Sequence, residues 1–133
     1  MNIRTDVAAL ICILDVQCSP LTRLKTKFPT VQFHPCITEN DTDWQPHTRE
    51  TWKDVSKRVH NFFMWLLQQP HNNIAVVTHG VWMECALLNY CPEVLQCGKR
   101  VHNCDVYSGK VGWSSDGKSI VLTNVEQIMF DDQ

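Results

Sequence analysis

The most regular pattern along the chain is a set of apolar residues that recur every three or four positions between Trp52 and Leu67. This spacing places them on one face and predicts an amphipathic helix. Thr51 can cap the helix start, and Asp54, three residues later, completes a capping-box pattern. Pro70 and the asparagine pair that follows it predict that the helix ends before them.

A second pattern follows at once, in which the β-branched run Ile74–Val77 leads into Thr78, His79 and Gly80, and then into the amphipathic stretch Val81–Tyr90. It predicts a buried strand, a tight turn and a helix start. In an α/β sheet such a turn lies where ligands bind. A helix start offers unpaired N–H groups to an anion, and a glycine lets the backbone turn sharply or approach a ligand. The pattern therefore predicts that His79 contacts a phosphate.

Four further segments of the chain carry weaker patterns, with turn residues between them. They are a strand over Val7–Val16 (a helix stays open), a short helix over Leu21–Lys27, and late strands over Cys104–Val111 and Ile120–Val125. A long connection is expected over Thr30–Pro46. The alternation of helices and strands predicts the α/β class.

The composition narrows the class of protein. A chain of 133 residues with 44% hydrophobic content predicts one domain over residues 1–133. The net charge of −2 gives no electrostatic case for binding nucleic acid or an anionic membrane. The apolar run Ala8–Leu14 is too short to span a bilayer, and no signal-peptide cleavage site follows it. The seven cysteines include no CxxC pair; disulfides stay open, but reduced thiols in a cytoplasmic protein are the simpler interpretation.

The string Val76-Val77-Thr78-His79-Gly80 resembles the second histidine motif of the histidine phosphatase superfamily, the phosphoglycerate mutase-like proteins. The resemblance implies a three-layer α/β/α sandwich that hydrolyses or transfers phosphate monoesters without a metal or other cofactor. It also implies that His79 acts in catalysis and that Gly80 lies at the substrate. A small phosphorylated metabolite or phosphate is then the expected ligand, and the oligomeric state stays open.

In that family the nucleophile is a first histidine within an Arg-His-Gly motif, and this string does not occur in the sequence. We therefore expect a partial, N-terminally truncated domain. Two functions stay open: a phosphatase or mutase-like protein impaired by the loss of the nucleophile motif, and a pseudoenzyme that binds a phosphate ligand without turnover.

Two alignments with the family compete in the first half of the chain. Ser19–Arg23 resembles the family's Ser-Pro-Leu-x-Arg element, in which Arg23 would clamp phosphate through its guanidinium fork. Glu39 would then be the general acid. Alternatively, Phe28-Pro29 and the stretch Trp44–Glu50 resemble a subgroup found in plants and fungi. In that alignment Arg23 is a surface charge and Glu39 a loop carboxylate.

The stretch Val101–Asp105 resembles the family's late Asn-Cys element. The resemblance implies that Asn103 positions a phosphate through its amide, and gives His102 and Cys104 a lesser claim to a role. Cysteine and histidine also gather in this region, but their spacings match no standard zinc site, so no metal is expected.

Gly112–Ser119 satisfies the phosphate-binding P-loop string Gly-x4-Gly-Lys-Ser. A P-loop requires a helix after the string, whereas Ile120–Thr123 favours a strand. The sequence therefore predicts a hairpin turn on Asp116-Gly117 instead.

Overall fold

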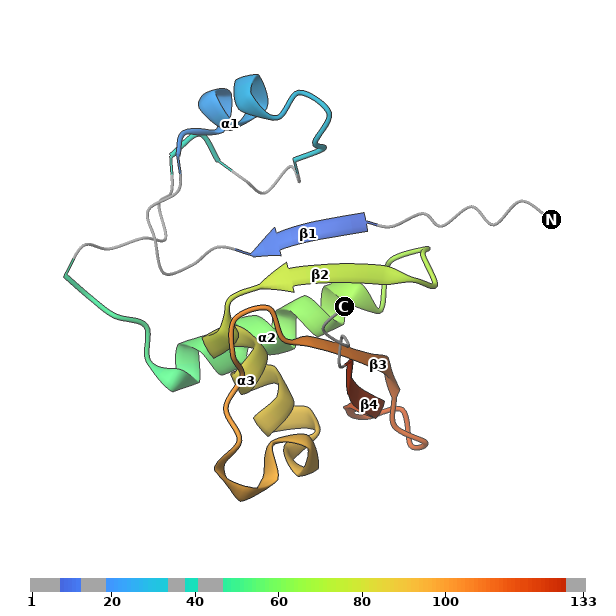
Figure 1. Ribbon diagram of the computed structural model, residues 1–133. Helices are drawn as coiled ribbons and strands as arrows, with labels where there is room; N and C mark the ends of the chain where they lie inside the picture. Colours follow the sequence, from blue (N-terminus) through green and yellow to red (C-terminus); the bar gives the residue numbers. More distant parts are fainter. Residues whose placement is uncertain (1–7, 13–18, 34–37, 41–46, 129–133) are drawn as a thin grey trace, which may run out of the picture. The chain divides into compact units, whose positions relative to one another are not determined.

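The computed structural model describes residues 8–12, 19–33, 38–40 and 47–128 (Figure 1). Their elements are β1 (Ala8–Cys12), α1 (Leu21–Lys27), α2 (Trp52–Leu66), β2 (Ile74–Thr78), α3 (Gly80–Tyr90), the 3-10 helix η1 (Pro92–Gly98), β3 (Val106–Trp113) and β4 (Ile120–Ile128). The chain divides into two compact units: residues 12–49 form one, and residues 1–11 with 50–133 form the other. Each predicted helix and strand is present, with bounds that differ by a few residues, and η1 was not predicted.

Helix α2 begins where the sequence predicts. The Thr51 side chain accepts a hydrogen bond from the Asp54 backbone N–H, and the Asp54 carboxylate accepts one from the Thr51 backbone N–H at 3.0 Å. These reciprocal bonds satisfy two N–H groups that a helix start leaves unpaired. The hydrogen bonds from Thr51 also lower the pKa of Asp54. The predicted capping box is confirmed.

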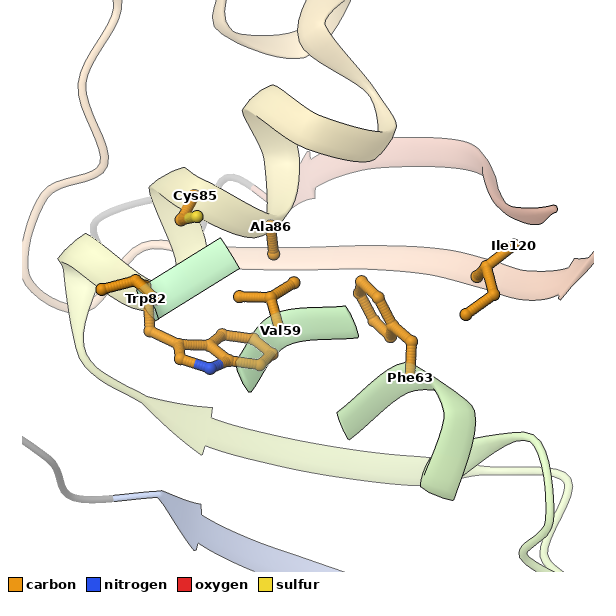
Figure 2. Packing of buried hydrophobic residues seen from close by; sticks show 7 residues of the cluster. Val59, Phe63, Trp82, Cys85, Ala86 and Ile120 are labelled. Carbon is orange, nitrogen blue, oxygen red and sulfur yellow. The ribbon is translucent and has the colours of Figure 1, made fainter. Parts of the chain in front are cut away.

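The core of the larger unit lies where α2 and α3 pack together (Figure 2). Val59 is fully buried on α2, and Trp82 and Cys85 are buried on α3. The Trp82 indole meets the Phe62 ring edge-to-face, with 5.1 Å between their centroids. Ile120 brings β4 into the same cluster. The core therefore fixes α3, and with it the turn that precedes α3.

Strand β2 pairs with β1, and the two arrows run in the same direction in Figure 1. Exposure alternates along β2, and Val77 is 59% exposed. The prediction of a buried strand is wrong, because half-buried and exposed residues alternate along β2 and none is fully buried. A strand is buried on both sides only where two layers cover it, and one face of β2 is exposed among the described residues.

Strands β3 and β4 form an antiparallel hairpin in which Trp113 pairs with Ile120. In its turn the Asp116 carboxylate accepts hydrogen bonds from the Ser114 hydroxyl and the Lys118 backbone N–H. Gly117 has a φ of +69°, a left-handed conformation that favours glycine. The P-loop string is thus a hairpin turn, as predicted.

Within the described ranges, no helix has the length and apolar character needed to cross a membrane.

Candidate functional site

One pocket of about 150 Å³ lies between the β2–α3 turn and the loop that leads to β3. Three of the residues predicted from the sequence line it together: His79, Gly80 and Asn103. The complete lining is Thr78, His79, Gly80, Met83, Val101, His102, Asn103, Cys104 and Asp105. Two segments that are distant in the sequence, 78–83 and 101–105, therefore form two walls of one site.

The first wall is the start of α3. His79 is the residue that precedes the helix, with extended backbone angles (φ −80°, ψ 149°), and its carbonyl accepts a hydrogen bond from the Met83 N–H. Its imidazole is exposed and makes no capping hydrogen bond. The first turn of α3 carries no acidic side chain. Its N–H groups and partial positive charge therefore favour an anion at this position.

Gly80 is not required by the fold of the chain itself. Its φ is not among the positive values, and an added Cβ would lie 3.6 Å from the Val101 carbonyl oxygen, an ordinary contact distance. The sequence suggested two reasons for a glycine at this position, a sharp turn of the backbone or close approach of a ligand. The backbone angles exclude the sharp turn, so space for a ligand is the reason that remains.

Thr78 is a lining residue that sequence reasoning missed. Its Oγ1 atom is buried and has no hydrogen-bond partner among the described residues. A buried hydroxyl without a partner costs free energy. The only sequence signal for this residue is a polar side chain at the end of an apolar strand.

The second wall is the tight turn from His102 to Asp105. The Asp105 carboxylate accepts a 2.8 Å hydrogen bond from the His102 backbone N–H, and the Asp105 N–H donates to the His102 carbonyl at 3.2 Å. Tyr107 also donates to this carboxylate, at 3.5 Å. Burial, together with the charge of Asp105, raises the pKa of Tyr107. Cys104 adopts a left-handed φ of 68°, which completes the turn.

Arg23 and Glu39 belong to the other unit, which comprises residues 12–49. The Glu39 carboxylate accepts hydrogen bonds from the Thr22 backbone N–H (3.1 Å) and the Thr22 hydroxyl (2.8 Å). The Leu21 N–H donates to the Glu39 carbonyl. Glu39 therefore caps the start of α1, while Arg23 is exposed on that helix. Their roles as general acid and phosphate clamp stay predictions.

The element Trp44–Glu50 is described only from residue 47 onward. Glu50 forms an ion pair with Arg58 of α2. This contact gives Glu50 a structural role at the entry to α2.

The thiols of this unit differ in exposure. Cys85 and Cys91 are free and buried, and Cys104 is free and exposed. Burial raises the pKa of Cys91 to about 11, and the neighbouring Glu93 adds to the effect. Among the described side chains, no group of three or more histidine, cysteine, aspartate or glutamate residues could hold a metal ion.

The chain belongs to the histidine phosphatase superfamily (branch 1), whose family model matches residues 18–126. This match extends over both compact units and includes the lining of the pocket. It confirms the predicted family and the α/β fold class.

Three curated relatives from Arabidopsis thaliana match the chain. Phosphoglycerate mutase-like protein 2 is 34% identical over 95 residues, which cover 68% of this chain and 28% of the relative. Phosphoglycerate mutase-like protein is 29% identical over 93 residues, which cover 66% of this chain and 34% of the relative. Phosphoglycerate mutase-like protein 1 is 34% identical over 87 residues, which cover 61% of this chain and 30% of the relative. The chain thus spans about a third of the length of these relatives, and no solved structure matches it significantly.

Proposed function

We propose that the pocket at the start of α3 binds the phosphoryl group of a small phosphate ester. The observation that carries this proposal is the convergence of His79, Gly80 and Asn103 on one pocket beside the first turn of a helix. Three kinds of donor are available there: an imidazole, a side-chain amide and the backbone N–H groups of α3. Phosphate oxygens accept hydrogen bonds from all three.

Two further features support the same ligand. Thr78 lines the pocket, and its buried hydroxyl has no partner among the described residues. Gly80, which neither backbone strain nor crowding demands, leaves room for an oxyanion close to the helix start. Both features favour a small and strongly hydrogen-bonding group over an apolar one.

The first candidate activity is hydrolysis or transfer of a phosphate monoester at an impaired rate. Membership of the superfamily supports the reaction class. The absence of an Arg-His-Gly string from the printed sequence supports the impairment, because phosphoryl transfer through an enzyme group needs a positioned nucleophile.

The second candidate is a non-catalytic protein that binds the phosphate ligand. The lining of the pocket also supports this second candidate, because binding a phosphate group requires hydrogen-bond donors but no nucleophile. In either case a phosphorylated metabolite is the proposed ligand. A cytoplasmic location is also proposed, since the seven cysteines of the sequence include no CxxC pair and reduced thiols are the simpler interpretation.

The test measures binding and turnover on the same preparation. Phosphate and vanadate should raise the melting temperature of the protein in proportion to their binding, and His79→Gln should abolish the increase. His71→Gln, which replaces an exposed histidine outside the pocket, should behave like the wild type. If the wild-type protein releases phosphate from p-nitrophenyl phosphate and His79→Gln does not, the first candidate is supported. If phosphate or vanadate stabilises the protein but no phosphate is released, the second candidate is supported. No stabilisation by either anion would overturn the proposal.

A further inference from the structure

A second histidine lines the pocket, to which the family resemblance gave only a lesser claim to a role. His79 lies on the α3 wall and His102 on the opposite wall. The described residues that line the pocket include no lysine or arginine. Arg100, which is close in sequence, is engaged by Glu84 at 2.8 Å. The lining side chains that can carry a positive charge are therefore the two imidazoles.

His102 is held in place by its own turn. Its backbone N–H donates to the Asp105 carboxylate, and its Nδ1 atom lies 3.8 Å from the same carboxylate oxygen. The His102 side chain is 78% exposed, whereas the Asp105 side chain is 16% exposed. The carboxylate thus faces one ring nitrogen and leaves Nε2 as the nitrogen that can donate to a ligand.

We propose that His102 is a second anion-binding residue of this pocket, and that His79 and His102 together make oxyanion binding strengthen as the pH falls. This inference rests on the proposed phosphate site and adds to it a residue and a dependence on pH. A protonated imidazole donates from both nitrogens and carries a charge, and charge-assisted hydrogen bonds are about twice as strong as neutral ones.

The sign of the pH dependence follows from the groups that face His102. Histidine ordinarily gains its proton near pH 6.5, so an oxyanion favours the protonated form and binds more tightly below that pH. The Asp105 carboxylate faces the ring from its own turn, with 3.8 Å between its Oδ2 atom and Nδ1 of His102. The hydroxyl of Tyr107, whose pKa is raised, remains neutral. His79 and Cys104 complete the titratable groups among the described lining residues.

The experiment titrates the full chain with sulfate at about pH 5.5 and about pH 8, at constant ionic strength. Sulfate keeps its charge of −2 between these values, so a change in affinity comes from the protein. We expect wild-type affinity to be at least roughly tenfold higher at the lower pH, the factor expected from one charge-assisted hydrogen bond. His102→Gln keeps an N–H donor but does not titrate, and should reduce this dependence to the part that His79 contributes.

His71→Gln is the matched control and should keep the wild-type pH dependence. Because His102 is exposed, its substitution should leave the fold intact, which the NMR spectrum of the variant verifies. Wild-type binding without pH dependence, or a His102→Gln variant that keeps the full dependence, would overturn this inference while leaving the phosphate site standing. Failure of wild-type protein to bind sulfate or phosphate at either pH would instead overturn the proposed function as well.

Discussion

The Oδ2 atom of Asp105 accepts a 2.8 Å hydrogen bond from the backbone N–H of His102. This bond closes the turn that forms one wall of the pocket. Tyr107 donates to the same oxygen from the first residues of β3. One mostly buried carboxylate therefore connects the loop to the hairpin and places His102 opposite the start of α3.

Replacement of Asp105 tests this connection. Asp105→Ala should destabilise the protein by about 1–3 kcal/mol, because it leaves the His102 N–H and the Tyr107 hydroxyl without their acceptor. Asp105→Asn keeps an acceptor oxygen and should cost less. Urea unfolding measures both variants, and sulfate titration should show weaker binding for the alanine variant. Equal stability of the two variants would show that the hydrogen bonds do not hold the turn.

The capping box at the start of α2 predicts a pH dependence of stability. The hydrogen bonds from Thr51 hold the pKa of Asp54 below its ordinary value of 3.8. A carboxyl whose pKa is lower in the folded state stabilises the protein above its unfolded pKa, and loses this contribution as the pH falls through its folded pKa. The contribution of Asp54 should therefore disappear below about pH 4.

Thr51→Ala should cost about 1 kcal/mol at neutral pH, a typical value for the loss of an N-cap. It should also return the pKa of Asp54 toward 3.8, because the largest cause of the shift is the Thr51 side chain. Thr51→Ser keeps the hydroxyl and is the matched control. The checks are chemical denaturation and NMR titration of Asp54; an unchanged Asp54 titration in Thr51→Ala would contradict the assignment.

Alanine substitutions of two valines, one buried and one exposed, distinguish the contribution of core packing to stability from that of the surface. Val59 is 0% exposed on α2, and Val81 is 48% exposed on α3. Val59→Ala should destabilise the protein by about 2 kcal/mol, since it removes buried methyl groups and leaves a cavity. Val81→Ala should change stability by less than about 0.5 kcal/mol. Similar costs in thermal or urea unfolding would mean that the α2–α3 contact is not the core.

The thiols should react in the order of their exposure. Iodoacetamide at about pH 8 should alkylate Cys104 well before Cys85 and Cys91, because only an accessible thiolate reacts and burial raises the pKa of Cys91 to about 11. Peptide-resolved mass spectrometry measures each site separately. Denatured protein is the control and should lose the difference.

The same measurement reports on the pocket. Because Cys104 lines it, phosphate or vanadate should slow the alkylation of Cys104, whereas chloride at equal ionic strength should not. Protection of Cys85 or Cys91 to the same extent would point to a general stabilisation of the protein rather than to occupation of this site.

The features that could be predicted from the sequence are those built from neighbours along the chain. The capping box of Thr51 and Asp54 needs only a spacing of three residues. The hairpin turn on Asp116-Gly117 likewise follows from local turn chemistry. For this reason the sequence predicted a hairpin there although the segment matches the P-loop string. The placement of His79 at a strand–helix junction also depends on adjacent residues alone.

The partners of these elements came only from the tertiary structure. No local pattern brings His102 and Asp105 to the pocket that His79 lines, or leaves the Thr78 hydroxyl buried without a partner among the described residues. Likewise, the Glu39 carboxylate reaches Thr22 across 17 positions to cap α1. The physical reason is that periodicity and turn chemistry act within a few residues, whereas burial and side-chain contacts depend on which distant segments the core packs together.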